Sequence, residues 1–268
     1  MVVPSGFQSA IGSNAIAEEA FRPSSGLNAI TDSYSFFQTI QTPFVVQAPN
    51  FDFDGYEVFR IYVETMNSDD FIHRVYGDAE NNASFSAPSG VYNNSFCLGS
   101  TSGGVPPPAF FFDGNNSASF DSWVGIGLTQ FVSVGEDDVI IDETLSLPWS
   151  DNFNLQSMPT GNYGPVDFSL EDADSEGGWR LDDLAASNGF AGDDNRAIVM
   201  QVTSPGTIVW TLNAEIYIHG DPNNVVLMSQ TFDGTSMGPV VIEGCTNSEA
   251  CNYYDLATVD NGSCELPT

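Results

Sequence analysis

The chain has 268 residues, 36 of them acidic and only five basic, which gives a formal net charge of −31 at pH 7. All five basic residues are arginines, so Schiff-base chemistry and a P-loop lysine are excluded. The charge also excludes nucleic-acid binding by a basic patch and disfavours an anionic membrane surface, whereas cations are natural partners.

Segments with a period of two, rich in β-branched and aromatic residues, follow one another along the chain and predict strands. The expected strands are 34–40, 44–48, 57–65, 71–77, 122–134, 138–142, 165–170, 196–204, 207–220 and 224–232. In 207–220 the parity of the prominent side chains changes, which predicts a bulge near Asn213 or Ala214.

Many strands, short turns and almost no helix predict an all-β fold, an antiparallel β-sandwich or jelly roll. We expect an N-terminal arm over 1–24, the sandwich over 25–242 and a small cysteine-rich module over 243–268. No apolar run reaches the roughly 18 residues of a membrane span, so membrane insertion is not expected.

Three of the four cysteines, Cys245, Cys251 and Cys264, lie in the module "GCTNSEACNYYDLATVDNGSC". Their spacing and the lack of a nearby histidine argue against zinc, and so short a segment needs a disulfide to be stable. The fourth, Cys97, is a candidate partner that would attach the module to the sandwich. Four cysteines allow three pairings, and the sequence does not choose between them. A disulfide would indicate an extracellular, cell-surface or virion-surface setting.

Acidic loops ending in glycine are candidate Ca²⁺ sites, because Ca²⁺ binds carboxylate and carbonyl oxygens. The alternative is that these acids are simply solvated, or serve turns. The candidate ligands are Asp172, Asp174, Glu176, Asp193, Asp194, Asn252, Asp255 and Asp260.

Aromatic residues and histidines give two further candidate sites. Phe110, Phe111 and Phe112 are consecutive, so at least one ring faces away from any core and would mark a contact surface. The four tryptophans could form a platform for glycans, although core packing is the commoner role. His73 and His219 are the only imidazoles available to a hydrolase, and no G-x-S-x-G motif accompanies them.

The module resembles a repeat, G-C-T-x-x-x-A-C-N-Y-x-x-x-A-T-x-D-x-G-S-C, of large secreted or surface proteins from marine Bacteroidetes and some marine viruses and algae. The matching residues are Gly244, Cys245, Thr246, Ala250, Cys251, Asn252, Tyr253, Ala257, Thr258, Asp260, Gly262, Ser263 and Cys264. The upstream segments "FRIYVETMNSDDFIHRVYGDAEN" and "FDSWVGIGL" more loosely resemble a domain that accompanies such modules. The resemblance implies a secreted, surface-displayed protein with a structural or adhesive role and no catalytic residues.

We therefore expect a non-enzymatic structural or adhesive protein that self-assembles as a homo-oligomer or surface array and is stabilised by Ca²⁺. A carbohydrate-binding module of the same fold, which would bind glycans through an acidic calcium loop and exposed aromatic rings, is the alternative. A hydrolase is a third, less favoured possibility.

Overall fold

The structure is a computed structural model that describes residues 33–43, 51–93, 120–128, 136–142, 161–163, 165–172, 175–239 and 241–267. These residues belong to one compact unit, Thr31–Thr268. In these ranges the chain forms β-strands and short 3-10 turns, with no α-helix, so the all-β prediction is confirmed. No helix in the described ranges has the length and apolar character needed to span a bilayer. The expected arm 1–24 and strand 44–48 lie outside them.

One sheet has four antiparallel strands in the order β1-β2-β12-β6. Their bounds are β1 (Ser35–Gln41), β2 (Glu57–Glu64), β12 (Arg196–Ser204) and β6 (Trp123–Val124). All but the first residue of β12 are buried. Burial of both faces explains why this strand reads as a nearly continuous apolar run rather than an alternating one.

The second sheet has ten strands, and its main path is β10-β11-β3-β13-β14-β15-β16, with β4, β7 and β9 attached to it. Their bounds are β3 (Phe71–Gly77), β4 (Ser84–Ala87), β7 (Ile140–Asp142), β9 (Val166–Ser169), β10 (Glu171–Asp172), β11 (Ser175–Arg180), β13 (Val209–Tyr217), β14 (Val225–Phe232), β15 (Val241–Gly244) and β16 (Val259–Asp260). A separate pair joins β5 (Val91–Asn93) to β8 (Gly161–Tyr163).

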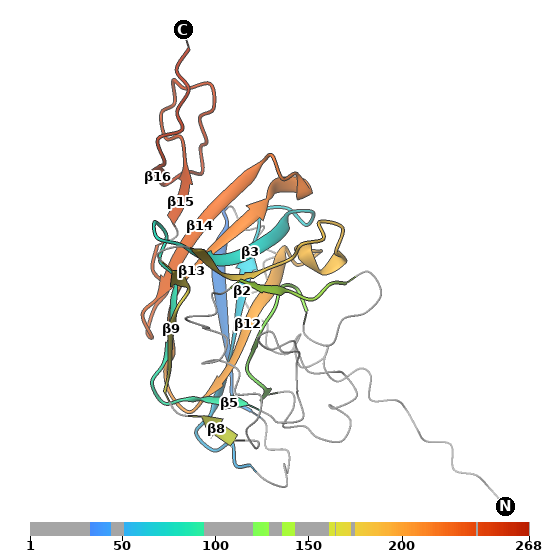
Figure 1. Ribbon diagram of the computed structural model, residues 1–268, viewed down its shortest axis with the longest axis vertical. Coiled ribbons are helices and arrows are strands. Elements are labelled where there is room, and N and C mark those ends of the chain that lie inside the picture. Colours follow the sequence, from blue (N-terminus) through green and yellow to red (C-terminus); the bar gives the residue numbers. More distant parts are fainter. Residues whose placement is uncertain are drawn as a thin grey trace, which may run out of the picture. The chain divides into compact units, whose positions relative to one another are not determined.

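The main core draws side chains from both large sheets, whose labelled strands can be followed in Figure 1. Phe36 of β1 contacts Trp210 of β13, with 5.5 Å between ring centroids. The indole N–H of Trp210 donates to Oε1 of Gln38 at 2.7 Å, which satisfies its buried donor. The two antiparallel sheets thus pack together as a sandwich.

A bulge does lie close to the predicted Asn213 or Ala214, at Glu215, but the extra residue is His73 of β3 and not a residue of β13. Trp210, Leu212, Ala214 and Ile216 are all fully buried, and β13 pairs with β14 without a shift in register. The core face of β13 is therefore continuous through small Ala214. The polar side chains at odd positions, including Glu215, belong to the other face, so no extra residue is needed to explain them.

Two other segments differ from the sequence reading. The acidic stretch expected as a loop forms the hairpin β10–β11, with Glu171 opposite Glu176 and Asp172 opposite Ser175. At the C-terminus, β15 pairs with β14 on one side and, in parallel, with β16 on the other. The boundary expected at residue 243 thus falls inside a strand that the sandwich and the cysteine module share.

Candidate functional site

The two histidines of the chain both connect β3 to β13. His73 lies in β3, and its Nδ1 is 2.9 Å from Oε1 of Glu215 on β13. His219 lies in η5 (Ile218–Gly220), directly after β13, and its Nδ1 is 2.8 Å from Oδ1 of Asp69, just before β3. Because the strands are antiparallel, the start of one meets the end of the other, which unites groups 150 residues apart.

A β-bulge aims His73 at Glu215. The β3–β13 register shifts next to Glu215, so His73 has no opposite residue. A bulge brings neighbouring side chains of one strand toward the same side, so both His73 and Arg74 reach Glu215. Nε and Nη2 of Arg74 each donate to Oε2 of Glu215 at 2.8 Å. The ring of Tyr217 stacks on His73, with 4.7 Å between centroids.

The network changes the pKa of two of its members, Glu215 and Tyr217. Burial opposes ionisation of Glu215, but the hydrogen bond from His73 and the charge of Arg74 outweigh it and lower the pKa of Glu215 to about 2. An ionised carboxylate only accepts hydrogen bonds, so Glu215 bonds Nδ1 of His73 in the tautomer that carries its proton on this nitrogen. The hydroxyl of Tyr217 also lies 2.9 Å from the same Nδ1. Burial and the neighbouring Glu215 raise the pKa of Tyr217 to about 12. Carboxylate–histidine pairs of this kind orient Nε2 in catalytic and metal sites, and here the pair also ties two strands together.

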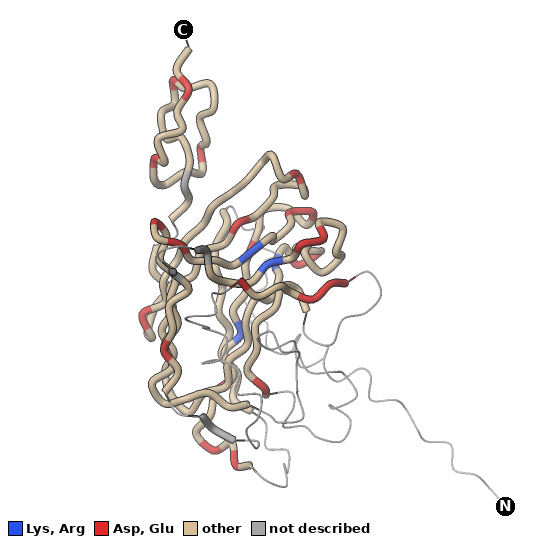
Figure 2. The backbone as a smooth tube through the Cα atoms, in the orientation of Figure 1, with Lys and Arg blue, Asp and Glu red and all other residues tan. Residues whose placement is uncertain are grey.

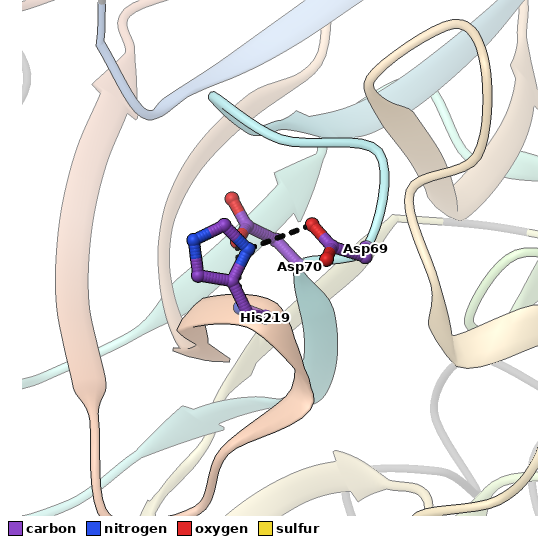
Figure 3. A group of neighbouring side chains, drawn as sticks. All are labelled: Asp69, Asp70 and His219. Carbon is purple, nitrogen blue, oxygen red and sulfur yellow. Dashed lines mark hydrogen bonds and ion pairs between the residues drawn. The ribbon is translucent and has the colours of Figure 1, made fainter.

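The second cluster consists of Asp69, Asp70 and His219, drawn in Figure 3. One ligand atom from each lies within 4.8 Å of the others, and this is the one such group of His, Cys, Asp and Glu found among the described residues. The hydrogen bond and charge of Asp69 raise the pKa of His219, and the same bond lowers the pKa of Asp69. His219 has a φ of 53°, a left-handed conformation that is uncommon outside glycine.

The hydrogen bonds of Asp70 decide what this cluster can hold. Its side chain is fully buried and accepts from the hydroxyl of Tyr34, from the backbone N–H and amide of Asn67 and from the N–H of His219, at 3.0 to 3.1 Å for the shortest contact of each. With its lone pairs used, only Asp69 and His219 remain for an ion. Zinc sites take three or four protein ligands and Ca²⁺ six to eight oxygens, so the cluster fits a structural joint better than a metal centre.

Sequence reasoning missed Asp69 and Asp70. It considered His219 only as a catalytic base at the end of a strand. The sequence signal for this cluster is the pair of acids directly before the strand 71–77. It becomes informative only once β3 is known to pair with β13.

The predicted Ca²⁺ ligands of the sandwich are only partly covered by the described residues. Asp172 and Glu176 lie in strands β10 and β11, with their side chains outside the description, and Asp174 lies outside it altogether. Asp193 and Asp194 are exposed in the turn that precedes β12. The Ca²⁺ assignment of these residues remains a prediction.

The predicted ligands of the module have structural partners. The amide of Asn252 donates to the carbonyl of Ser263 at 2.6 Å and accepts from the N–H of Glu265 at 2.8 Å. Oδ1 of Asp260 accepts from the N–H of Gly262 at 2.8 Å. Asp255 is exposed. Of the three, Asn252 has the least capacity left for an ion.

The structure selects one cysteine pairing. Cys245 and Cys264 form a disulfide across 19 positions, and Cys251 is free and exposed. An attachment of Cys245 or Cys264 to Cys97 is therefore wrong, because the module closes on itself. Cys97 lies outside the described residues, as do the predicted contact residues Phe110, Phe111 and Phe112.

The described tryptophans do not form a glycan platform. Trp123, Trp179 and Trp210 are buried in the cores, and Trp149 lies outside the described residues. Figure 2 shows acidic residues in the module and in many loops of the sandwich, with few arginines among them.

Comparisons with protein-family models, with curated proteins and with solved structures find no match to this chain.

Proposed function

We propose that this protein is a non-enzymatic structural or adhesive subunit of an extracellular, cell or virion surface, and that it self-assembles with Ca²⁺. The observation that carries the proposal is β15, which pairs with the sandwich through β14 and with the module through β16. The module thus extends the sheet by main-chain hydrogen bonds instead of following a free linker. A disulfide-closed extension of this kind suits a spacer or cap between neighbouring subunits.

The net negative charge of the chain is the reason why assembly would need Ca²⁺. Copies with a net charge of −31 repel one another, and divalent cations bound between carboxylates would offset that repulsion. Asp193, Asp194 and Asp255 are exposed acids at the surface where such contacts would form. The resemblance of the module to repeats of secreted surface proteins agrees with this role.

The test is particle size by light scattering, with electron microscopy of the same samples, in millimolar Ca²⁺ and after chelation. A sample without Ca²⁺ at matched ionic strength separates ion binding from general screening. We expect ordered assemblies that need Ca²⁺, and that weaken when Asp193 and Asp194 are both replaced by Asn. Asp52→Asn together with Asp54→Asn removes the same charge from another loop and serves as the control. A monomer in every condition would refute assembly and make a glycan array the next experiment.

A further inference from the structure

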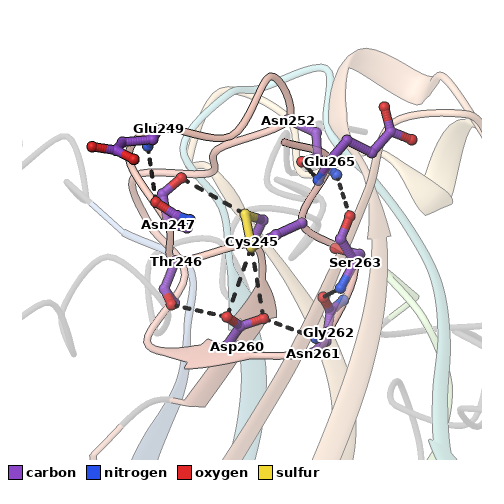
Figure 4. Close-up of a disulfide and its surroundings, with 11 residues drawn as sticks. Cys245, Thr246, Asn247, Glu249, Asn252, Asp260, Asn261, Gly262, Ser263 and Glu265 are labelled. Atoms are coloured by element: carbon purple, nitrogen blue, oxygen red, sulfur yellow. Dashed lines mark hydrogen bonds between the residues drawn. A yellow bond between two sulfur atoms is a disulfide. The ribbon is translucent and has the colours of Figure 1, made fainter. Parts of the chain in front are cut away.

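The disulfide of the module lies against a carboxylate. Oδ2 and Oδ1 of Asp260 are 3.7 and 3.9 Å from Sγ of Cys264, and Figure 4 shows this carboxylate beside the sulfurs. A sulfur atom in a disulfide carries no hydrogen, so the contact is not a hydrogen bond. It brings a carboxylate close to an atom that an incoming thiolate would attack.

Two donors hold Asp260 in this position. The N–H of Gly262 donates to Oδ1 at 2.8 Å, and the hydroxyl of Thr246 donates to Oδ2 at 3.4 Å. Gly262 has a φ of 78°, a conformation that glycine adopts without strain. The turn after β16 therefore fixes the carboxylate next to the disulfide.

The backbone segment that carries the free cysteine of the module pairs with the segment that carries Cys264. The N–H of Cys251 donates to the carbonyl of Glu265 at 2.8 Å, and the amide of Asn252 bonds both Ser263 and Glu265. These two partners are the residues on either side of Cys264. The segment with the exposed thiol is thus hydrogen-bonded to the segment with the disulfide.

We propose that Asp260 protects the Cys245–Cys264 disulfide from exchange with Cys251, and that removing its charge lets the module change its pairing. In the exchange, the Cys251 thiolate attacks Sγ of Cys264. A Cys251–Cys264 bond forms as the Cys245–Cys264 bond breaks, and Cys245 leaves as a thiolate. Cys251 has given up one proton and Cys245 takes one up, so nothing is oxidised or reduced overall.

The exchange would weaken the junction between the module and the sheet. Cys245 directly follows β15, and its carbonyl accepts from the N–H of Tyr254 at 2.9 Å. Tyr254 in turn packs against the main core. A released Cys245 would remove the covalent closure of this segment. The inference does not depend on the proposed function, since it concerns a single chain without Ca²⁺.

The size of the protection follows from Coulomb's law. The Asp260 carboxylate is 3.7 Å from the sulfur under attack, and we take about 4 Å as its separation from the incoming thiolate; a unit charge at that distance slows attack about fivefold in water. Asp260→Asn keeps an oxygen that accepts from Gly262 and removes the charge. Asp255→Asn removes the same charge from an exposed position in the module and is the matched control.

The experiment uses the full chain in EDTA at pH 8, without added thiol. Free thiols are alkylated at intervals, and the modified cysteine is identified by peptide mass. Cleavage after Glu249 and before Asp255 places the three cysteines on separate peptides in the wild type and in Asp260→Asn. For Asp255→Asn, cleavage before Asp260 does the same.

In Asp260→Asn, the alkylated residue should change from Cys251 to Cys245 about fivefold faster than in the wild type. Asp255→Asn should behave like the wild type. In 1 M NaCl the difference should shrink, because the screening length falls to about 3 Å. Equal rates in all three proteins, or an equal acceleration by Asp255→Asn, would overturn the proposal.

A second arm separates charge from loss of structure. In a Cys251→Ser background, anionic glutathione or cationic cysteamine supplies the attacking thiolate. Asp260→Asn should speed reduction by glutathione and leave reduction by cysteamine no faster. Acceleration by both reagents would mean that the module has merely loosened, and would also overturn the proposal.

Discussion

Replacing Asp70 by Asn should destabilise the sandwich far more than the same change at the adjacent Asp69. The Asp70 carboxylate is fully buried and accepts hydrogen bonds from Tyr34, Asn67 and His219, which belong to three separate parts of the chain. Asp69 is exposed, and its side chain contacts Nδ1 of His219 at 2.8 Å. The two neighbours thus offer a matched pair of substitutions.

The magnitude follows from the donors. A hydrogen bond to a charged group contributes about 1.5–3 kcal/mol. Asn keeps one accepting oxygen and turns an NH₂ group toward the remaining donors, so about two bonds are lost. Part of the stability lost with these bonds is regained because the substitution also removes a buried charge. We expect a loss of about 3 kcal/mol, or roughly 6–12 °C in Tm for a unit of this size.

The assay is urea unfolding followed by tryptophan fluorescence, because Trp123, Trp179 and Trp210 are buried and report loss of the core. Tyr34→Phe removes a single donor and should cost about 1 kcal/mol. Equal unfolding midpoints for Asp70→Asn and Asp69→Asn would refute the reasoning. So would a wild-type midpoint that rises with Zn²⁺, since Asp70 would then have a lone pair free for a metal.

Three further predictions concern the module and the ion pairs. Cys245→Ser should cost about 3 kcal/mol of local stability, because the disulfide with Cys264 closes a loop of about 20 residues, and limited proteolysis of the module would reveal it. The pKa of Glu215 is lowered to about 2, so its stabilising effect is complete above about pH 4.5 and is lost as the pH falls toward 2. Glu215→Gln should make the free energy of unfolding depend less on pH in that range. An unchanged pH profile would contradict this. The pKa of His219 is raised, so its stabilising effect is complete below pH 6.5 and is lost as the pH rises through the pKa of His219 in the folded protein. Asp69→Asn should lower this pKa, measured by NMR titration of His219.

The strands that the sequence predicts best are those with a regular period and buried neighbours. β2, β3, β12 and β14 match their predicted segments closely. The hairpin β10–β11 was missed because Asp, Glu, Ser and Gly are unfavourable in strands. Pairing of β11 with β3 and β7 outweighs that local preference.

The candidate site was harder to predict because it depends on register. Asp70 and His219 meet only when β3 and β13 pair in one alignment, and no local pattern fixes that alignment. The bulge in the β3–β13 pairing also depends on register and was not located from the sequence. Side-chain parity in 207–220 suggested an irregularity, but the extra residue is His73 in the neighbouring strand. Because β13 keeps one core face throughout, side-chain parity within 207–220 carries no information about a bulge in β3.

The arginines explain why the net charge matters for any contact between copies. Arg74 pairs with Glu215, Arg180 with Asp142 and Asp182, and Arg196 with Glu64. These three arginines already form ion pairs within the chain. If each of the five arginines offsets one acid, 36 − 5 = 31 negative charges remain on the chain, with both histidines counted as neutral. A second copy brings only the same excess, so the opposite charge at a contact must come from solution. Assembly driven by burial of apolar surface alone would persist without divalent ions, whereas assembly through these carboxylates has to follow cation concentration.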